Sequence, residues 1–380
     1  MVDDDFRSLP VMSLDSHAKL KISFDFIADE QPWIDYNIIH CDAQWNPDDL
    51  SELSYLQYSN LPHHVEDIES SFNTFLQYYH YQVELPNEDI MPTISGNYAV
   101  VFHFQDEPDS LLAIACFMIT ESMAFVSGEV SGNTDIDFRA SHQQLSMQVS
   151  WSDVKLPHLQ PAEDLKILVQ QNGRRDNQRW IEHPSSMQSN KAVYEHDRQL
   201  IFEAGNHWRR FEFTDERYPG LGVDHIRYQA PFYHAFIHRD HTRHQGSYLY
   251  DQDQHGRYKI HALNVDDVDT EAEYFYAEFE FKAPAHLDTQ GIYLVGSLTN
   301  QEIDETTRME YDSEQEVYRK SLLLKEGAYN YQYLVPVKNG LTGAMTEGNH
   351  YETPNEYQIF VYYHPFGSRY DRLIGTAIIK

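Results

Sequence analysis

Four histidines that lie close together in the sequence are the first candidates for a metal site. They are His234, His238, His241 and His244. Imidazoles four residues apart on one face of a helix suit zinc. Residues 233–237, however, are typical of a strand that enters a loop, and Arg239 and Arg243 would repel a divalent cation. We therefore interpret 234–244 as a solvated strand edge and turn, and the sequence predicts no metal site.

Residues 251–256 begin like a calcium-binding EF-hand loop. Asp251 and Asp253 occupy the first and third positions of the loop, and Gly256 occupies the sixth. The twelfth position is Ala262, where a bidentate glutamate should complete the coordination. The segment is therefore predicted to form a hairpin turn rather than a calcium site.

Catalytic motifs are isolated matches. Ser16 and Lys19 have the S-x-x-K spacing, but the S-D-N and K-T-G motifs that accompany it in β-lactamases are missing. The pair Glu352 and Glu356 has the residue types of a glycosidase, yet a chain with 60 acidic residues contains such pairs by chance. We predict that the protein is not an enzyme, with no catalytic or cofactor-binding residues, no cofactor and no small-molecule substrate. A hydrolase whose site converges from unlinked residues stays open, and partner-binding residues are not identified.

The two cysteines, Cys41 and Cys116, permit at most one disulfide bond. Both lie in apolar, strand-like runs, which favours buried and inert thiols. Whether they pair stays open.

The composition limits the partners of the chain. It has 380 residues, and 60 acidic against 28 basic side chains give a formal net charge of −32. This charge argues against nucleic acid or an anionic membrane surface as the main partner. No apolar run approaches the roughly 18 residues that span a bilayer. The N-terminus has no signal-peptide pattern, so the protein is either cytosolic or has lost its signal peptide.

The elements that would position any site are mostly strands. Polar and apolar residues alternate in 21–26, 97–104 and 274–281, as half-buried strands require. Residues 328–334 place three tyrosines on one side. Helical periodicity is limited to short stretches such as 47–56. We therefore predict an all-β chain of tandem immunoglobulin-like or early-set β-sandwiches with little helix.

Polar breaks between strands suggest three domains. We expect an N-terminal β-sandwich at 6–122, a middle β-rich domain at 123–265, and a C-terminal early-set-like β-sandwich at 266–380. Each has about the usual size of one sandwich domain.

Three groups of motifs, in sequence order, resemble one known family. The first is 36–47 with 71–74 and 85–89, the second is 169–174 with 248–257, and the third is 347–353 with 361–375. Together they are similar to the plug protein of the type IX secretion system of Bacteroidota-like bacteria, a family formerly catalogued as a domain of unknown function.

This resemblance implies a non-enzymatic protein that associates with the outer-membrane translocon barrel and seals its periplasmic opening. It also implies a periplasmic, outer-membrane-associated location, with a removed signal peptide and no direct membrane span. We interpret the family residues as architectural. Asn87, Gly96, Gly348 and Gly367 suit turns with positive φ or a local Asn hydrogen bond. Tyr362, Phe366 and Tyr370 are expected to be core or strand-face aromatics.

The last domain has a weaker resemblance to the early-set sandwich of glycogen-binding modules. It rests on 291–300, 318–324 and 329–333. In those modules a tryptophan that stacks on sugar rings follows the turn, whereas Gln301 stands there in this chain. The resemblance still makes a carbohydrate-binding or polysaccharide-processing accessory protein the alternative function. Glycan binding by this domain stays open.

Overall fold

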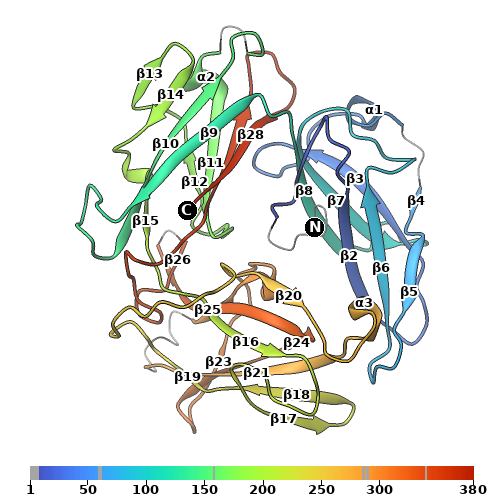
Figure 1. Cartoon of the computed structure of the whole chain (residues 1–380). Helices are drawn as coiled ribbons and strands as arrows, with labels where there is room; N and C mark the ends of the chain where they lie inside the picture. Colours follow the sequence, from blue (N-terminus) through green and yellow to red (C-terminus); the bar gives the residue numbers. More distant parts are fainter. Residues whose placement is uncertain (1–7, 59–61, 157–158, 285–286, 288–290, 339) are drawn as a thin grey trace.

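The chain folds almost entirely into β-strands, as the computed structural model shows (Figure 1). The structure describes residues 8–58, 62–156, 159–284, 287, 291–338 and 340–380. Its α-helices in this part of the chain are α1 (Glu52–Tyr55), α2 (Pro161–Asp164) and α3 (Val268–Glu271). None of the described helices is long and apolar enough to cross a membrane.

The first sandwich contains the N-terminal strands. Its larger sheet has the order β1 (Val11–Ser13), β8 (Ala113–Thr120), β7 (Gly96–Phe104), β3 (Ile34–Cys41), β4 (His63–His64). Its smaller sheet has the order β2 (Leu20–Ile27), β6 (Tyr78–Leu85), β5 (Asp67–Ser70). Tyr81 from the smaller sheet and Tyr98 and Phe102 from the larger one belong to the core between them.

The second sandwich combines strands from the middle and the end of the chain. One sheet has the order β13 (Ser186–Gln188), β14 (Lys191–Tyr194), β10 (His142–Trp151), β15 (Ile201–Glu203), and β9 (Ala124–Ser131) also pairs with β10. The other has the order β12 (Arg179–Ile181), β11 (Leu165–Gln171), β27 (Tyr357–Tyr363), β28 (Arg372–Ile379). Leu145, Ile167 and Ile359 belong to the core between these sheets.

The third sandwich is formed by the segment of the chain that lies in sequence between the two parts of the second sandwich. One sheet has the order β16 (Arg209–Phe213), β25 (Gly327–Val337), β20 (Tyr258–Ile260), and β22 (Tyr293–Val295) and β26 (Gly340–Thr342) also pair with β25. The other has the order β17 (Val223–Gln229), β18 (Phe232–Ile237), β21 (Tyr274–Lys282), β24 (Val317–Lys325), β23 (Glu310–Asp312), and β19 (Asp240–His241) also pairs with β21. Phe211, Phe279 and Tyr331 belong to its core.

The strand pairing does not follow the predicted boundary near residue 265. Strand β11 pairs with β27 of the C-terminal region, and β16 and β18 pair with β25 and β21. Polar breaks between strands mark where a strand ends but carry no information about which distant strand becomes its partner. Domain limits stay a prediction, and we propose 8–122, 123–205 with 353–380, and 206–352.

The expected all-β sandwich architecture is confirmed, and local patterns located several strands well. Residues 275, 277, 279 and 281, expected on one face of a strand, are all buried in β21. The tyrosines at 329, 331 and 333 are likewise buried in β25. Of the stretch 47–56, only α1 is helical.

Candidate functional site

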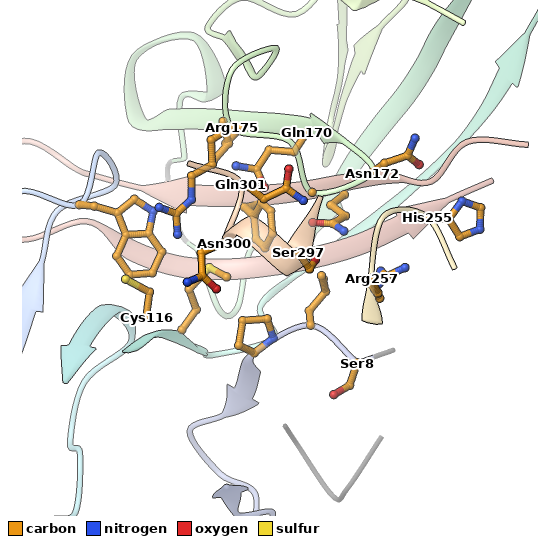
Figure 2. Close-up of a pocket in the computed structure, with 18 of the residues that line it drawn as sticks. Ser8, Cys116, Gln170, Asn172, Arg175, His255, Arg257, Ser297, Asn300 and Gln301 are labelled. Atoms are coloured by element: carbon orange, nitrogen blue, oxygen red, sulfur yellow. The ribbon is translucent and has the colours of Figure 1, made fainter. Parts of the chain in front are cut away.

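A cavity at the meeting point of the three sandwiches is the candidate site. It has a volume of about 230 Å³, and all three sandwiches contribute to its lining. Figure 2 shows Arg175 and Cys116 at one end of it, and His255, Arg257 and Ser8 at the other. The cavity therefore depends on how the three bodies are held together.

A buried ion pair joins the first and third sandwiches. Lys325 Nζ lies 2.6 Å from Asp25 Oδ2 and 2.7 Å from the carbonyl oxygen of Asp269. The side chains of Lys325 and Asp25 are only 7% and 6% exposed. Tyr274 donates to the same carboxylate at 2.7 Å, and His80 contacts its other oxygen at 2.6 Å. Burial alone would raise the pKa of Asp25, but His80 and Lys325 hold it below its usual value.

The second and third sandwiches are joined by a charged cluster around Glu356. Arg257 and Lys380 each lie 2.8 Å from its carboxylate, and His255 lies 3.5 Å away. Burial opposes ionisation, yet the hydrogen bond from Lys380 and the charge of Arg257 lower the pKa of Glu356. Burial also lowers the pKa of His255, which favours the neutral imidazole.

The first and second sandwiches share an apolar interface. Ala43 and Met118 of the first sandwich cluster with Leu168, Phe360 and Leu373 of the second. Polar contacts fix the register of this interface. The hydroxyl of Tyr362 donates to Asn97 Oδ1 at 2.9 Å, and the amide of Ala43 donates to Asp371 Oδ2 at 3.0 Å.

Two loops place the side chains at the Arg175 end of the cavity. Asn172 and Gly173 have φ values of 53° and 70°, so the chain turns after β11 and brings Arg175 to the cavity. The side chain of Asn172 holds this turn by accepting from Glu356 N at 2.9 Å and donating to Asn355 Oδ1 at 2.7 Å. Trp45 lines the cavity from a loop of the first sandwich.

The lining of the cavity is cationic and rich in amides although the protein is strongly acidic. No Asp or Glu occurs among the described residues that line it. Five Asn and Gln side chains line it, at positions 170, 172, 300, 301 and 358. Arg175 has no carboxylate within ion-pair distance in the described part of the chain and instead faces the thiol of Cys116. Burial raises the pKa of Cys116, and Arg175 offsets part of this effect. Such a lining suits a carboxylate or a peptide backbone.

The residues first considered for metal chemistry have other partners. His234 contacts Glu278 at 2.7 Å, and His238 contacts Asp224 at 3.7 Å. Asp251 and Asp253 pair with Arg210 and His207. Among the residues that the structure describes, no group of three or more His, Cys, Asp or Glu side chains is arranged to hold a metal ion. The two cysteines are free thiols, and burial raises the pKa of Cys41 to about 11.

Most of the family residues have the local geometry that we expected of them. Gly96, Gly348 and Gly367 have positive φ, and Asn87 Oδ1 accepts two nearby backbone amides. Tyr362 is buried as expected. The expectation for Phe366 was wrong, because its side chain is fully exposed at the tip of the loop between β27 and β28. A pattern of aromatic residues near a strand does not distinguish a core ring from a loop tip.

The sequence motifs contained several cavity residues without showing that they meet. Trp45, Asn172, Arg257 and Tyr362 come from all three groups of motifs and line the same cavity. Arg175 was missed, because it lies one residue beyond the second group. Its position two residues after the Asn172–Gly173 pair was the available signal.

Comparisons with known proteins identify the family. Residues 1–121 match the model of the type 9 secretion system plug protein 1st domain. A crystal structure of a hypothetical protein from Parabacteroides merdae ATCC 43184 is 39% identical and superposes with a TM-score of 0.95. The alignment covers 99% of this chain and 94% of that one. No curated protein matches the chain. The first part of the chain, residues 1–121, therefore belongs to the type 9 secretion system plug protein family, and this match supports an involvement in type 9 secretion.

Proposed function

We propose that the protein is a non-enzymatic stopper that seals the periplasmic opening of the outer-membrane translocon barrel of the type 9 system. The observation that carries the proposal is the match of residues 1–121 to the plug family. The protein would then work in the periplasm, associated with the outer membrane.

The junctions between the sandwiches support this role physically. A stopper needs a fixed shape, because movement between its sandwiches would leave gaps at the opening that it seals. Buried ion pairs with further hydrogen bonds, such as Lys325 with Asp25, permit few alternative geometries between two bodies. The apolar cluster between the first and second sandwiches restrains the remaining junction.

The net charge of −32 suggests how the stopper finds its opening. A basic rim on the barrel would attract an acidic stopper and accelerate its association. The association rate should then fall as salt is raised. Equal rates at low and high salt would contradict this electrostatic part of the proposal.

Carbohydrate binding through residues 290–335 receives less support. The tyrosines at 318, 329, 331 and 333 are buried in the core of the third sandwich, so their rings cannot stack on a sugar. Retention on immobilised glycogen or starch would favour this alternative, provided that it is lost when aromatics in 290–335 are replaced.

The test of the proposed function is purification of the tagged protein from its native envelope. We expect a very large outer-membrane barrel to co-purify, and electron microscopy of the complex to show this chain across the periplasmic mouth. Consistent absence of the barrel, or binding at a different place on it, would contradict the proposal.

A further inference from the structure

The first sandwich has an open sheet edge that borders a groove. Strand β1 pairs with β8 only at residues 118–120, whereas β7 pairs with β8 from 113 to 119. Within the described residues, no strand lies beside the other edge of β8 at 113–117, and no further backbone hydrogen bond satisfies it. Unpaired backbone groups on a sheet edge are a template for another strand.

The groove runs between this edge and the third sandwich. It has a volume of about 510 Å³, and apolar side chains line it on both sides together with the Asp25–Lys325 ion pair. From the first sandwich the wall includes Phe24, Ala113 and Ile114, and from the third it includes Ile260 and Leu323. Ile114 is 54% exposed, which is unusual for an apolar side chain on an unprotected edge strand.

The groove leads into the cationic cavity, since Ser297 and Asn300 line both. The Cys116 end of the open edge therefore points to Arg175, whereas the Ala113 end lies in the apolar part. Residues 8–10 line the cavity at this end, and β1 then occupies the remaining edge of β8. A strand added at 113–117 cannot continue along the sheet, so its pairing with β8 must end there.

We propose that the groove binds the C-terminal segment of a partner polypeptide as an added strand on β8. Its backbone pairs with residues 113–117, a length of about 17 Å at the usual rise per residue. Its apolar side chains contact the groove walls, and its terminal carboxylate lies near Arg175 and the cavity amides. The carboxylate end thus lies at Cys116, so the added strand runs parallel to β8, as β1 does. An amino terminus would instead be repelled by Arg175, whereas the charge of Arg257 is balanced by Glu356.

This inference is separate from the sealing function, because either can fail while the other holds. The probe is a fluorescein-labelled nonapeptide of alternating Val and Thr with a free C-terminal carboxylate. Two matched peptides carry either a C-terminal amide or N-methyl groups on alternate residues. Binding is measured by fluorescence anisotropy on the full chain, and hydrogen exchange locates the protected amides.

We expect the free-acid peptide to bind and to protect the amides of residues 114 and 116 from exchange, because the amides of 113, 115 and 117 already face β7. Amidation should weaken binding roughly tenfold, because a charge-assisted hydrogen bond is lost. N-methylation should abolish binding, because it removes the donors of the added strand. No binding by the free acid up to its solubility limit, or protection elsewhere, would overturn the proposal.

Variants separate the edge from the carboxylate pocket. Arg175→Gln should reproduce the tenfold loss for the free acid and leave the amidated peptide unaffected, whereas Arg139→Gln, another exposed arginine of the second sandwich, should change neither. Ile114→Lys places a charge on the edge and should prevent binding. Leu111→Lys is the matched control, since Leu111 is 63% exposed and lies outside both cavities. Equal effects of Ile114→Lys and Leu111→Lys, with unchanged melting temperatures, would contradict the assignment of the edge.

Discussion

Replacing Lys325 with methionine removes the cation that joins the first and third sandwiches. Methionine keeps an unbranched chain of similar length that can still pack on the ring of Tyr78, over which Lys325 Nζ lies at 4.4 Å. The carboxylate of Asp25 then stays buried without the charge that now lies 2.6 Å away. The change therefore isolates the electrostatic contribution of this junction.

The size of the effect follows from what remains around Asp25. Breaking a buried ion pair by removing one partner costs about 3–5 kcal/mol. His80 and Tyr274 still contact the carboxylate in the variant, so we expect the lower end, about 3 kcal/mol. For cooperative unfolding of 380 residues, this corresponds to a melting temperature lowered by about 4 °C.

The assay is calorimetric unfolding of four proteins at neutral pH. Lys19→Met is the control, since Lys19 and Glu84 form an ion pair with side chains 60% and 45% exposed, and its loss should cost under about 1 kcal/mol. The double variant Asp25→Asn with Lys325→Met should recover part of the stability, because no unpaired charge stays buried. The reasoning is refuted if Lys325→Met matches Lys19→Met, or if the double variant is no more stable than the single one.

The pH dependence gives a further check on this prediction. Asp25 has a lowered pKa in the folded protein, so its stabilising contribution is complete above its unfolded pKa of about 4. That contribution is lost as the pH falls through the folded-state pKa. The difference in stability between wild type and Lys325→Met should therefore shrink in acid, whereas a packing defect would not depend on pH.

Three other substitutions test separate parts of the structure. Burial raises the pKa of Glu326 to about 7, so the wild type loses stability relative to Glu326→Gln as the pH rises from about 4.5 to 7. Thermal melts should show a relative gain for the variant of at most about 3 kcal/mol over this range. A difference that does not change with pH would contradict this. Gly96→Ala should destabilise the protein by about 2 kcal/mol more than Gly205→Ala. An added Cβ would lie 2.5 Å from His40 Nε2 at Gly96, whereas no atom lies within 4 Å of it at Gly205. Equal denaturation midpoints of the two variants would contradict this. Phe366→Asp should change the unfolding free energy by less than about 0.5 kcal/mol, because the ring is fully exposed. It should weaken co-purification of the translocon if this loop tip contacts the translocon. A large loss of stability would show that the ring packs in the folded protein.

The fold class could be predicted from local sequence patterns because each strand of a sandwich shows its own two-residue alternation of polar and apolar side chains. The alternation in 274–281 places four apolar side chains on the buried face of β21, and no long-range information is needed for that. Pairing is different. Strands β11 and β27 lie side by side although almost two hundred residues separate them in sequence, and neither strand specifies the other by its own pattern. The boundary expected at 265 did not anticipate this pairing.

The candidate site was harder to predict because it lies between bodies rather than in one of them. Trp45 and Arg257 each read as part of a motif, but their common cavity exists only once three sandwiches have docked. The open edge of β8 depends on where β1 stops, which a three-residue strand does not reveal in advance. Asn172 and Gly173 form a turn, and that turn brings Arg175 into the cavity.

The most direct test of the sealing role is conductance through the translocon barrel, reconstituted in a planar bilayer. Adding this protein on the periplasmic side should close the open-channel current, and washing it away should restore the current. If the barrel stays equally conductive at saturating protein, the chain does not obstruct the pore and the account fails.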